Sequence, residues 1–343
     1  MIVRAVSDVV SAPIFIELDN IIPQSPVFVK LEGLNIAGSI KLKTAKQIIL
    51  DLRERGILQA GSQIIESSSG NLGLALAIVS LEQGYSFTCV SDPMISPMTE
   101  KLLKALGANV IIVNVADSAG GYLEARLKTI KRLLKENPRL VWTNQYANLS
   151  NSLAHYLSTG PEILASFPSP NYVFIGAGTT GTLMGCARYI REKSPLTRIV
   201  AVDPVGSVTF GGRPGCRHLP GIGTSRRPEL ADESLIDEVV YVPEVSAVRM
   251  CRAILRRNGL MLGASSGSVL SAVALKQDAI SAGDTVVAVS ADFGDRYYNT
   301  LYDDGWVTER FGDAWSRPAD EIVDRHFHHV DESVTRLSET GQL

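Results

Sequence analysis

The sequence has little of the features that would assign a protein to a class at once. Its 343 residues include three tryptophans and four cysteines, and neither sign of charge dominates, because 33 Lys and Arg stand against 36 Asp and Glu. The net charge of −3 gives no electrostatic footprint for nucleic acid or an acidic membrane. No run is long and apolar enough to cross a bilayer, and the first residues lack the pattern of a secretion signal. We therefore expect a cytoplasmic protein with neither nucleic-acid nor membrane partners.

Metal and redox signals are also sparse. The four cysteines form no C-x-x-C pair, which argues against a zinc site or a redox dithiol. Three of the five histidines fall within residues 326–329. In this polar segment a solvated tail is the simpler interpretation than a metal site. We expect no metal.

Length and patterning together predict the fold class. The chain exceeds one typical core, so we expect two lobes. Strand-like apolar runs alternate with helical ones, which is typical of parallel strands covered by helices. We predict an α/β protein with two open, mostly parallel twisted sheets and helices on both faces. The expected parts are a smaller N-terminal domain at 36–146, a larger domain made of 10–35 and 147–312, and a polar C-terminal tail at 313–343.

One glycine-containing stretch places a lysine at the start of a predicted helix. Gly38 allows backbone conformations closed to other residues, and Ser39 can cap a helix. Lys41 then falls in the first turn, where the helix macrodipole and desolvation both lower the pKa of an amine. A neutral lysine is a nucleophile. The alternative is an ordinary surface lysine, which is what we expect of Lys43 and Lys46.

A glycine-rich turn at 176–181 permits two interpretations. Its G-x-G-x-x-G pattern follows a predicted strand and opens a helix, and Asp203 closes the next strand, as in nicotinamide-dependent oxidoreductases. Alternatively, G-T-T-G-T at 178–182 forms a cup for a phosphate monoester, built from backbone N–H groups and threonine hydroxyls. The turn alone leaves both open.

Two further turns are rich in serine. S-S-S-G-N at 67–71 precedes a predicted helix, so its hydroxyl and backbone donors can cradle a carboxylate. A capped helix start is the alternative, for which one serine would suffice. G-A-S-S-G at 263–267 also stands before an apolar helix, where a serine is more often a cap than a ligand contact.

Taken together, G-S-I-K ending at Lys41, S-S-G-N at 68–71, G-T-T-G-T at 178–182 and G-A-S-S-G at 263–267 resemble the pyridoxal-phosphate enzymes of fold type II. This family includes cysteine synthase and the tryptophan synthase β-subunit. Four motifs in the right order over most of the chain make the match specific. The oxidoreductase interpretation explains one turn and leaves Lys41 and the serine-rich turn without a role.

The resemblance implies pyridoxal 5'-phosphate as the cofactor, with Lys41 forming the Schiff base and later carrying a proton. Asn71 would hydrogen-bond the ring oxygen, and Ser265 would meet the pyridine nitrogen. A serine cannot keep that nitrogen protonated as a carboxylate would, so loss of a β-leaving group is favoured over transamination or decarboxylation. The cofactor phosphate would be held by Gly178, Thr179, Thr180, Gly181 and Thr182.

The resemblance also implies a two-stage β-replacement: elimination from an O-activated serine leaves an aminoacrylate, to which a nucleophile adds. The substrate carboxylate would be held by Ser68, Ser69, Gly70 and Gln145. Further stretches, among them 92–97 and 219–226, resemble the branch that condenses O-phospho-L-serine with L-glutamate to N-(2-amino-2-carboxyethyl)-L-glutamate. That product is a precursor of 2,3-diaminopropionate for siderophores or peptide antibiotics.

A glutamate nucleophile carries two carboxylates that need cationic or multiple-donor partners. Our candidates are Arg126, at the exposed end of a predicted helix, and Tyr146, beside Gln145. For Arg126 a solvated helix charge is the alternative. Arg226 could contact substrate or close the cleft as part of a mobile loop.

The chain departs from its family directly after the lysine, where an acid and an arginine are usual and Leu42 and Lys43 stand instead. Leu42 cannot make the polar contacts of the acid, so the support of Lys41 or the placement of substrate is expected to differ. The nearest alternative function is a cysteine synthase that uses O-acetylserine or O-phosphoserine with sulfide. The set of Lys41, Asn71 and Ser265 argues against a non-catalytic scaffold. Because the family is usually dimeric, we expect a homodimer that acts on small amino acids.

Overall fold

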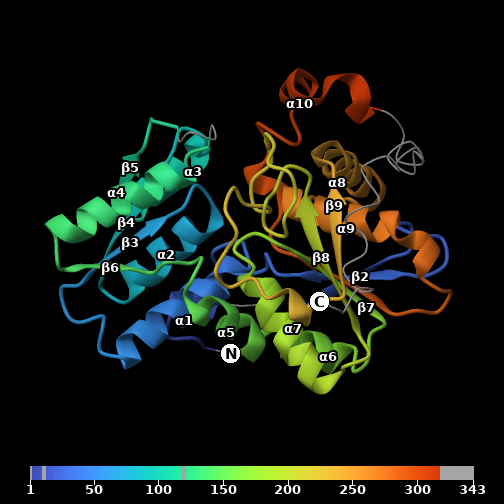
Figure 1. Cartoon of the computed structure of the whole chain (residues 1–343), viewed down its shortest axis with the longest axis horizontal. Helices are drawn as coiled ribbons and strands as arrows, with labels where there is room; N and C mark the ends of the chain where they lie inside the picture. The colour runs from blue at the N-terminus through green and yellow to red at the C-terminus, as the bar shows by residue number, and fades with distance from the viewer. Residues whose placement is uncertain (1, 10–12, 117–120, 317–343) are drawn as a thin grey trace, which may run out of the picture.

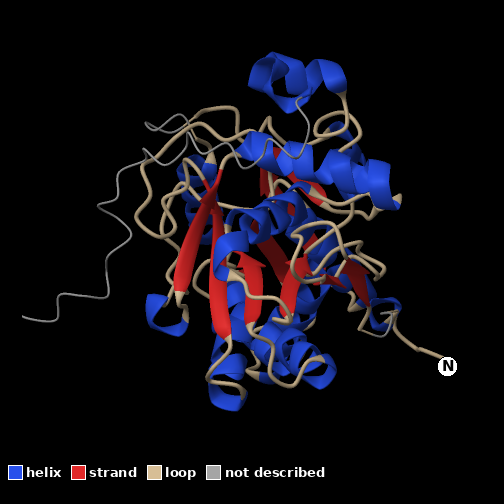
Figure 2. Ribbon diagram, turned by 90° about the vertical axis from the view of Figure 1, so that its right-hand side faces the viewer, coloured by secondary structure: helices blue, strands red, loops and turns tan. Residues whose placement is uncertain are grey.

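The computed structural model describes residues 2–9, 13–116 and 121–316. Two sheets lie side by side, each with helices packed on it (Figure 1). A view at right angles shows helices on both sides of the strands (Figure 2). The predicted α/β class with two mostly parallel sheets is confirmed.

The smaller sheet has four parallel strands in the order β5-β4-β3-β6. Successive residues of each strand point to opposite faces, so Ile64 packs in the same core as Ala45 and Leu76, whereas Ile65 packs with Ile130 on the other side. Helices therefore cover both faces. The elements are β3 (Gln63–Ser67), β4 (Ser86–Ser91), β5 (Asn109–Ile112), β6 (Leu140–Trp142), α1 (Lys41–Glu54), α2 (Asn71–Glu82), α3 (Pro97–Ala105) and α4 (Leu123–Glu136).

The larger sheet has six strands in the order β1-β2-β10-β7-β8-β9, in which only β1 is antiparallel. Its strands are β1 (Phe15–Leu18), β2 (Val27–Leu31), β7 (Tyr172–Gly176), β8 (Arg198–Pro204), β9 (Glu238–Val242) and β10 (Val286–Ser290). Val27 of β2 lies opposite Val286 of β10, so a strand that precedes the smaller sheet completes the larger one.

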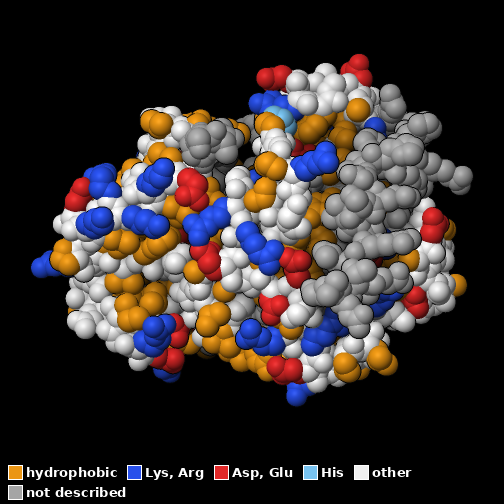
Figure 3. All heavy atoms as spheres, in the orientation of Figure 1, with side chains coloured by type: hydrophobic (Ala, Val, Ile, Leu, Met, Phe, Trp, Pro, Cys, Tyr) orange, Lys and Arg blue, Asp and Glu red, His pale blue; other side chains and the backbone are white. Residues whose placement is uncertain are grey.

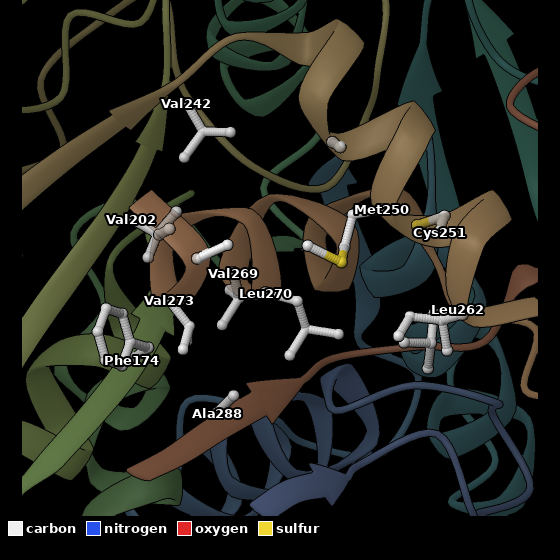
Figure 4. Packing of buried hydrophobic residues seen from close by; sticks show 14 of the residues in the cluster. Phe174, Val202, Val242, Met250, Cys251, Leu262, Val269, Leu270, Val273 and Ala288 are labelled. Carbon is white, nitrogen blue, oxygen red and sulfur yellow. The ribbon is translucent and has the colours of Figure 1, made fainter. Parts of the chain in front are cut away.

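Two separate cores hold helices to this larger sheet. On one face, Phe174, Val202 and Ala288 pack toward Val269 and Val273 of α9 (Figure 4). On the other face, alternate residues of the same strands pack against α6 and α7. The helices are α6 (Thr159–Ser166), α7 (Gly181–Lys193), α8 (Glu244–Asn258), α9 (Ala264–Leu275) and, near the end of the described chain, α10 (Asp304–Phe311).

The sequence patterns missed α10 and also α5 (Leu149–Leu157), which packs against both α1 and α7. It therefore links the two halves of the molecule next to the beginning of α1. The buried residues of α5 are Ser150, Asn151, Ser152, Ala154 and His155. All but Ala154 are polar, so the helix has no apolar periodicity from which the sequence could predict it.

The domain boundaries at 36–146 and at 10–35 with 147–312 remain a prediction. Residues 10–12 lie outside the described residues, as does most of the predicted tail from residue 317 on, including its histidines. The first tail residues belong to a short 3-10 helix, η5 (Gly312–Ser316). Within the described residues, no helix has the length and apolar character needed to span a membrane.

Candidate active site

Lys41 is the first residue of α1, as the sequence predicts, and Gly38 has a φ of +67° in the turn before it. The expected cap by Ser39 is wrong. Ile40 occupies the N-cap position, and the Ser39 hydroxyl is buried without a hydrogen-bond partner among the described residues. The larger sheet holds this stretch instead, because Ser39 forms an isolated bridge with Asp292 and the Ile40 N–H donates to the Ala291 carbonyl at 2.8 Å.

The electrostatic surroundings of Lys41 suit a reactive amine. Desolvation lowers the pKa of Lys41 below its ordinary value, and the negative charge of Asp292 opposes this shift. A larger fraction of Lys41 is therefore neutral than of an exposed lysine, and the neutral amine is the nucleophilic form.

A cavity that is open to solvent brings Lys41 together with two of the predicted turns. Its walls include the Gly178 to Thr182 turn between β7 and α7, and Ser265 at the second position of α9. Segments more than 200 residues apart in the sequence, counted from Lys41 to Ser265, thus line one space. Two of the three turns singled out in the sequence, at 178–182 and 263–267, therefore share one space with Lys41.

The turn before α7 has the properties of a phosphate cup. Thr180 has a φ of +64°, a left-handed conformation that β-branched residues rarely adopt. Its hydroxyl is buried and has no hydrogen-bond partner among the described residues. The first N–H groups of a helix also lack partners within the helix. An anion with several oxygens, such as a phosphate monoester, would satisfy these donors.

Two residues of α5 support the cup from behind, and sequence reasoning missed both. The Asn151 amide donates to the Thr179 hydroxyl at 3.0 Å, and His155 Nε2 lies 3.2 Å from the Thr182 hydroxyl. Burial, reinforced by the charge of Lys41, lowers the pKa of His155 well below its ordinary value, so its ring is neutral. Residues four positions apart lie on one face of a helix. Because α5 was not predicted, the spacing of Asn151 and His155 did not indicate that they face the same site.

Asn71 begins α2 and reaches across to the larger sheet. Its amide nitrogen donates to Asp292 Oδ2 at 2.7 Å, and its amide oxygen accepts from the Arg296 guanidinium. Arg296 also donates to the Ala37 carbonyl at 2.6 Å, and the Tyr297 hydroxyl donates to Asp292 at 2.8 Å. Burial raises the pKa of Asp292. Asp292 was missed, although a polar residue directly after a parallel strand is a signal that could have identified it.

The serine-rich turn is used in part as a cap. The Ser68 hydroxyl accepts from the Gly73 N–H in the first turn of α2 at 3.0 Å, although Gly70 occupies the N-cap position. Ser69 and Gly70 are half-buried beside it. The structure brings Gln145 to the same turn, because its side-chain amide donates to the Ser67 carbonyl at 2.8 Å. Whether Ser68, Ser69, Gly70 and Gln145 bind a carboxylate remains a prediction.

The expectation that Arg126 is at an exposed helix end is wrong. Its side chain is buried, because it lies on the same face of α4 as Leu127 and Ile130, which pack inward. The guanidinium lies 3.3 Å from Asp92 Oδ2, and its Nε has no hydrogen-bond partner among the described residues. The solvated alternative is therefore excluded as well.

Tyr146 lies within electrostatic reach of three arginines: Arg126, Arg217 and Arg226. Burial raises the pKa of Tyr146, so its hydroxyl remains protonated. Arg226 is about one-third exposed, pairs with Glu229 and lies 3.7 Å from Glu124 of α4. Figure 3 shows side chains of both charges interspersed over the face in view.

The two residues after Lys41 have structural reasons for their departure from the family pattern. Leu42 is buried in the core of the smaller sheet. Lys43 is not the ordinary surface lysine expected, because its ammonium lies 2.9 Å from Glu32 and 2.7 Å from Glu162. Lys30 contacts the same two carboxylates, at 2.9 and 2.6 Å. Four alternating charges thus fix the first turn of α1.

A lysine at a helix start, a phosphate cup and a serine in one cavity fit a pyridoxal-phosphate enzyme. Among the described residues, no group of three or more acidic, histidine or cysteine side chains is arranged to hold a metal ion. The family model described as pyridoxal-phosphate dependent enzyme matches residues 11–292, and the chain belongs to this family. It is therefore an enzyme with pyridoxal phosphate as its cofactor, as the resemblance predicts.

The chain is similar in sequence and in structure to several enzymes that act on amino acids. N-(2-amino-2-carboxyethyl)-L-glutamate synthase of Ralstonia nicotianae is 42% identical over 314 residues, which cover 90% of this chain and 92% of that protein. The crystal structure of O-ureido-L-serine synthase has a TM-score of 0.82 and 29% identity, with 92% of this chain and 99% of that chain covered. The O-acetylserine-dependent cystathionine β-synthase of Helicobacter pylori has a TM-score of 0.80 and 29% identity, covering 88% and 98%. Fold type II, predicted from the motifs, is confirmed.

Proposed function

We propose that the chain catalyses β-replacement on O-phospho-L-serine with L-glutamate, giving N-(2-amino-2-carboxyethyl)-L-glutamate and phosphate. The observation that carries this proposal is the 42% identity, over nine-tenths of the chain, to a protein named for that product. The product would supply 2,3-diaminopropionate for a siderophore or an antibiotic. We also propose a cytoplasmic homodimer.

The charges around Tyr146 support these substrates. O-Phospho-L-serine and L-glutamate together carry three carboxylates and a phosphate, and anions of this kind are bound best by guanidinium groups and multiple donors. Arg126 is buried with an unpartnered Nε, and Arg226 lies within reach of the same tyrosine, Tyr146. We assign these three residues to the acidic groups of the substrates.

In the proposed reaction, the Cα–H bond and the Cβ–O bond of O-phospho-L-serine break, and phosphate leaves. The glutamate nitrogen then bonds to Cβ, losing a proton, and a proton returns to Cα. Bound pyridoxal phosphate supplies the electron sink for the carbanion at Cα. Lys41 would carry the Cα proton on its Nζ, while Ser68, Ser69, Gly70 and Gln145 would hold the α-carboxylate.

Within the family, the residues assigned to the cofactor are Lys41, Asn71 and Ser265, together with the cup. The unpartnered Thr180 hydroxyl and the free N–H groups at the start of α7 support the phosphate assignment. The proximity of Asn71 to Asp292, the residue whose charge acts on Lys41, supports its place beside the ring.

A cysteine synthase that uses O-acetylserine or O-phosphoserine with sulfide is the second candidate. Its support is the structural likeness to the O-acetylserine-dependent enzyme and to a hydrogen sulfide-producing enzyme of Fusobacterium nucleatum, which has a TM-score of 0.80 and 28% identity. Sulfide needs no guanidinium partner, so the arginines around Tyr146 favour glutamate.

The two functions are separated by one experiment. Purified protein loaded with pyridoxal phosphate is incubated with O-phospho-L-serine or O-acetyl-L-serine, each with L-glutamate or sulfide. Phosphate release and product mass are measured. We expect the condensed amino acid with O-phospho-L-serine and glutamate. Cysteine formation with glutamate left unconsumed would contradict the proposal and establish the alternative.

A further inference from the structure

Glu66 is a buried acid that no step of the proposed reaction uses. It lies near the carboxyl end of β3, and its side chain has no solvent exposure. A buried carboxylate is costly unless donors surround it. Its burial therefore requires a structural account.

Four donors converge on this carboxylate. Oε1 accepts from the Ser67 N–H at 2.7 Å and from Trp142 Nε1 at 3.2 Å. Oε2 accepts from the Thr143 hydroxyl at 2.5 Å and from the Gln145 N–H at 3.0 Å. Burial raises the pKa of Glu66, and these four hydrogen bonds oppose that shift because they favour the ionised form.

The donors belong to two segments that leave neighbouring parallel strands. Ser67 opens the serine-rich turn after β3, while Thr143 and Gln145 follow β6, which pairs with β3 in parallel. The two segments also contact each other, through the bond from the Gln145 side chain to the Ser67 carbonyl. Glu66 thus joins the turn that contains Ser68 and Ser69 to the segment that contains Gln145.

The segment after β6 bends sharply, and a hydrogen bond to Glu66 holds the residue that follows the bend. Asn144 has a φ of +46°, a left-handed conformation that few non-glycine residues adopt. The N–H of the next residue, Gln145, donates to Glu66 Oε2 at 3.0 Å. Without the carboxylate, this bend would lose the acceptor that fixes the direction of Gln145.

We propose that Glu66 is a positioning residue. It sets the distance between the serine-rich turn and Gln145, and so shapes the binding site for the α-carboxylate of the substrate. This rests on the proposed function, in which Ser68, Ser69 and Gln145 bind that carboxylate. Glu66 contacts none of the residues assigned to the cofactor phosphate, so its effect is on amino-acid binding.

The test is Glu66→Gln in the full chain with bound cofactor. Glutamine keeps the size of the side chain, but its single carbonyl oxygen can accept for only one pair of donors, and its NH₂ group meets the other pair. L-Serine is the probe, because it carries the α-carboxylate without a phosphate. Its binding is followed by the absorbance change of the bound cofactor.

We expect the apparent dissociation constant for L-serine to rise at least about tenfold, the value of one charged hydrogen bond, while cofactor affinity changes less than threefold. Glu82→Gln is the matched control, since Glu82 on α2 accepts two bonds from Ser7 at 2.7 and 2.9 Å, away from the cleft. We expect it to leave L-serine affinity within twofold of the parent protein.

A double variant distinguishes positioning from general loosening. If Glu66 acts through Gln145, Glu66→Gln added to Gln145→Ala should cost little beyond Gln145→Ala alone. The proposal would be overturned if the losses of L-serine affinity in the two single variants multiplied in the double variant. It would also be overturned if Glu66→Gln lost cofactor affinity to the same extent as L-serine affinity, or if its L-serine affinity were unchanged. Should Glu66→Gln fail to fold, Thr143→Val removes one donor only, and an effect on L-serine of about threefold or more is expected; none would refute the role.

The outcome is separable from that of the proposed function. A parent protein that binds L-serine but does not consume O-phospho-L-serine with L-glutamate would refute the proposed reaction. The L-serine measurements on the Glu66 variants would still decide the positioning role.

Discussion

Replacing Lys43 by methionine removes one of the two cations from the buried cluster of Lys30, Glu32, Lys43 and Glu162. Lys43 is 15% exposed and Glu32 only 4%, so the remaining Lys30 must balance two carboxylates with little help from water. Removing one partner of a buried ion pair costs about 3–5 kcal/mol. Because Glu162 is 24% exposed, we expect the lower end, about 3 kcal/mol of unfolding free energy.

The cost should depend on pH. Burial opposes ionisation of Glu162, but the charges of Lys43 and Lys30 outweigh it and hold the pKa of Glu162 below its ordinary value of 4.5. A carboxyl group with a lowered pKa stabilises the fold above its ordinary pKa, and this contribution is lost as the pH falls through the folded value. The penalty of Lys43→Met is therefore largest at neutral pH and shrinks as the pH falls toward and below 4.5.

Urea unfolding of the cofactor-loaded protein, followed by circular dichroism at pH 7.5 and at a pH below 4.5, measures this effect. Lys46→Met is the control, since Lys46 lies on the same helix and pairs with Asp8 at the surface; its cost should stay below about 1 kcal/mol. Adding Glu162→Gln to Lys43→Met restores neutrality and should recover at least half of the loss. Equal costs for the two lysines, or a double variant less stable than Lys43→Met, would refute the reasoning.

Three further predictions follow from the site. Lys41→Ala should abolish the visible absorbance of lysine-bound cofactor and lower kcat at least about 1,000-fold, which spectra and steady-state assays would show; retained absorbance would exclude Lys41 as the attachment point. Gly181→Ala should weaken cofactor binding at least tenfold in equilibrium dialysis, because the added Cβ would lie 2.1 Å from Asn151 Oδ1; unchanged affinity would mean that the cup can widen. Burial raises the pKa of Asp203 from 3.8 to about 7, so folding holds a proton that the unfolded chain releases, and stability falls as the pH rises from about 4 to 7. Asp203→Asn should therefore stabilise the protein above pH 7, by at most about 4 kcal/mol, with no gain at pH 4. If the variant and the parent protein had the same urea midpoint above pH 7 as well as at pH 4, this prediction would be contradicted.

Local pattern was enough to predict most strands, the turns at their ends and the position of Lys41, because each depends on residues close in sequence. Val27–Leu31 and the helix that begins at Lys41 are examples. The turn at 178–182 was recognisable for the same reason, and its role as a phosphate cup remains a prediction.

Partnerships across the chain could not be predicted. Asp292 meets Asn71 over 221 positions, and Glu66 meets Gln145 over 79, and neither spacing leaves a periodic trace. The burial of Arg126 was missed because a guanidinium on an apolar helix face resembles a snorkelling surface side chain. Lys43 was misjudged because its two acidic partners come from separate segments, Glu32 just after β2 and Glu162 in α6, which are 11 and 119 residues away in sequence.

The bonds of Asn71 to Asp292 and Arg296 join α2, which packs on the smaller sheet, to the chain that follows the larger one. Asn71 thus connects the two halves through hydrogen bonds and is also a proposed contact of the cofactor ring. A ligand oxygen that accepts from the Asn71 amide must compete with Asp292 for that donor. Occupancy of the cavity and the mechanical stiffness of the joint are therefore coupled, and a substitution at Asn71 alters both together.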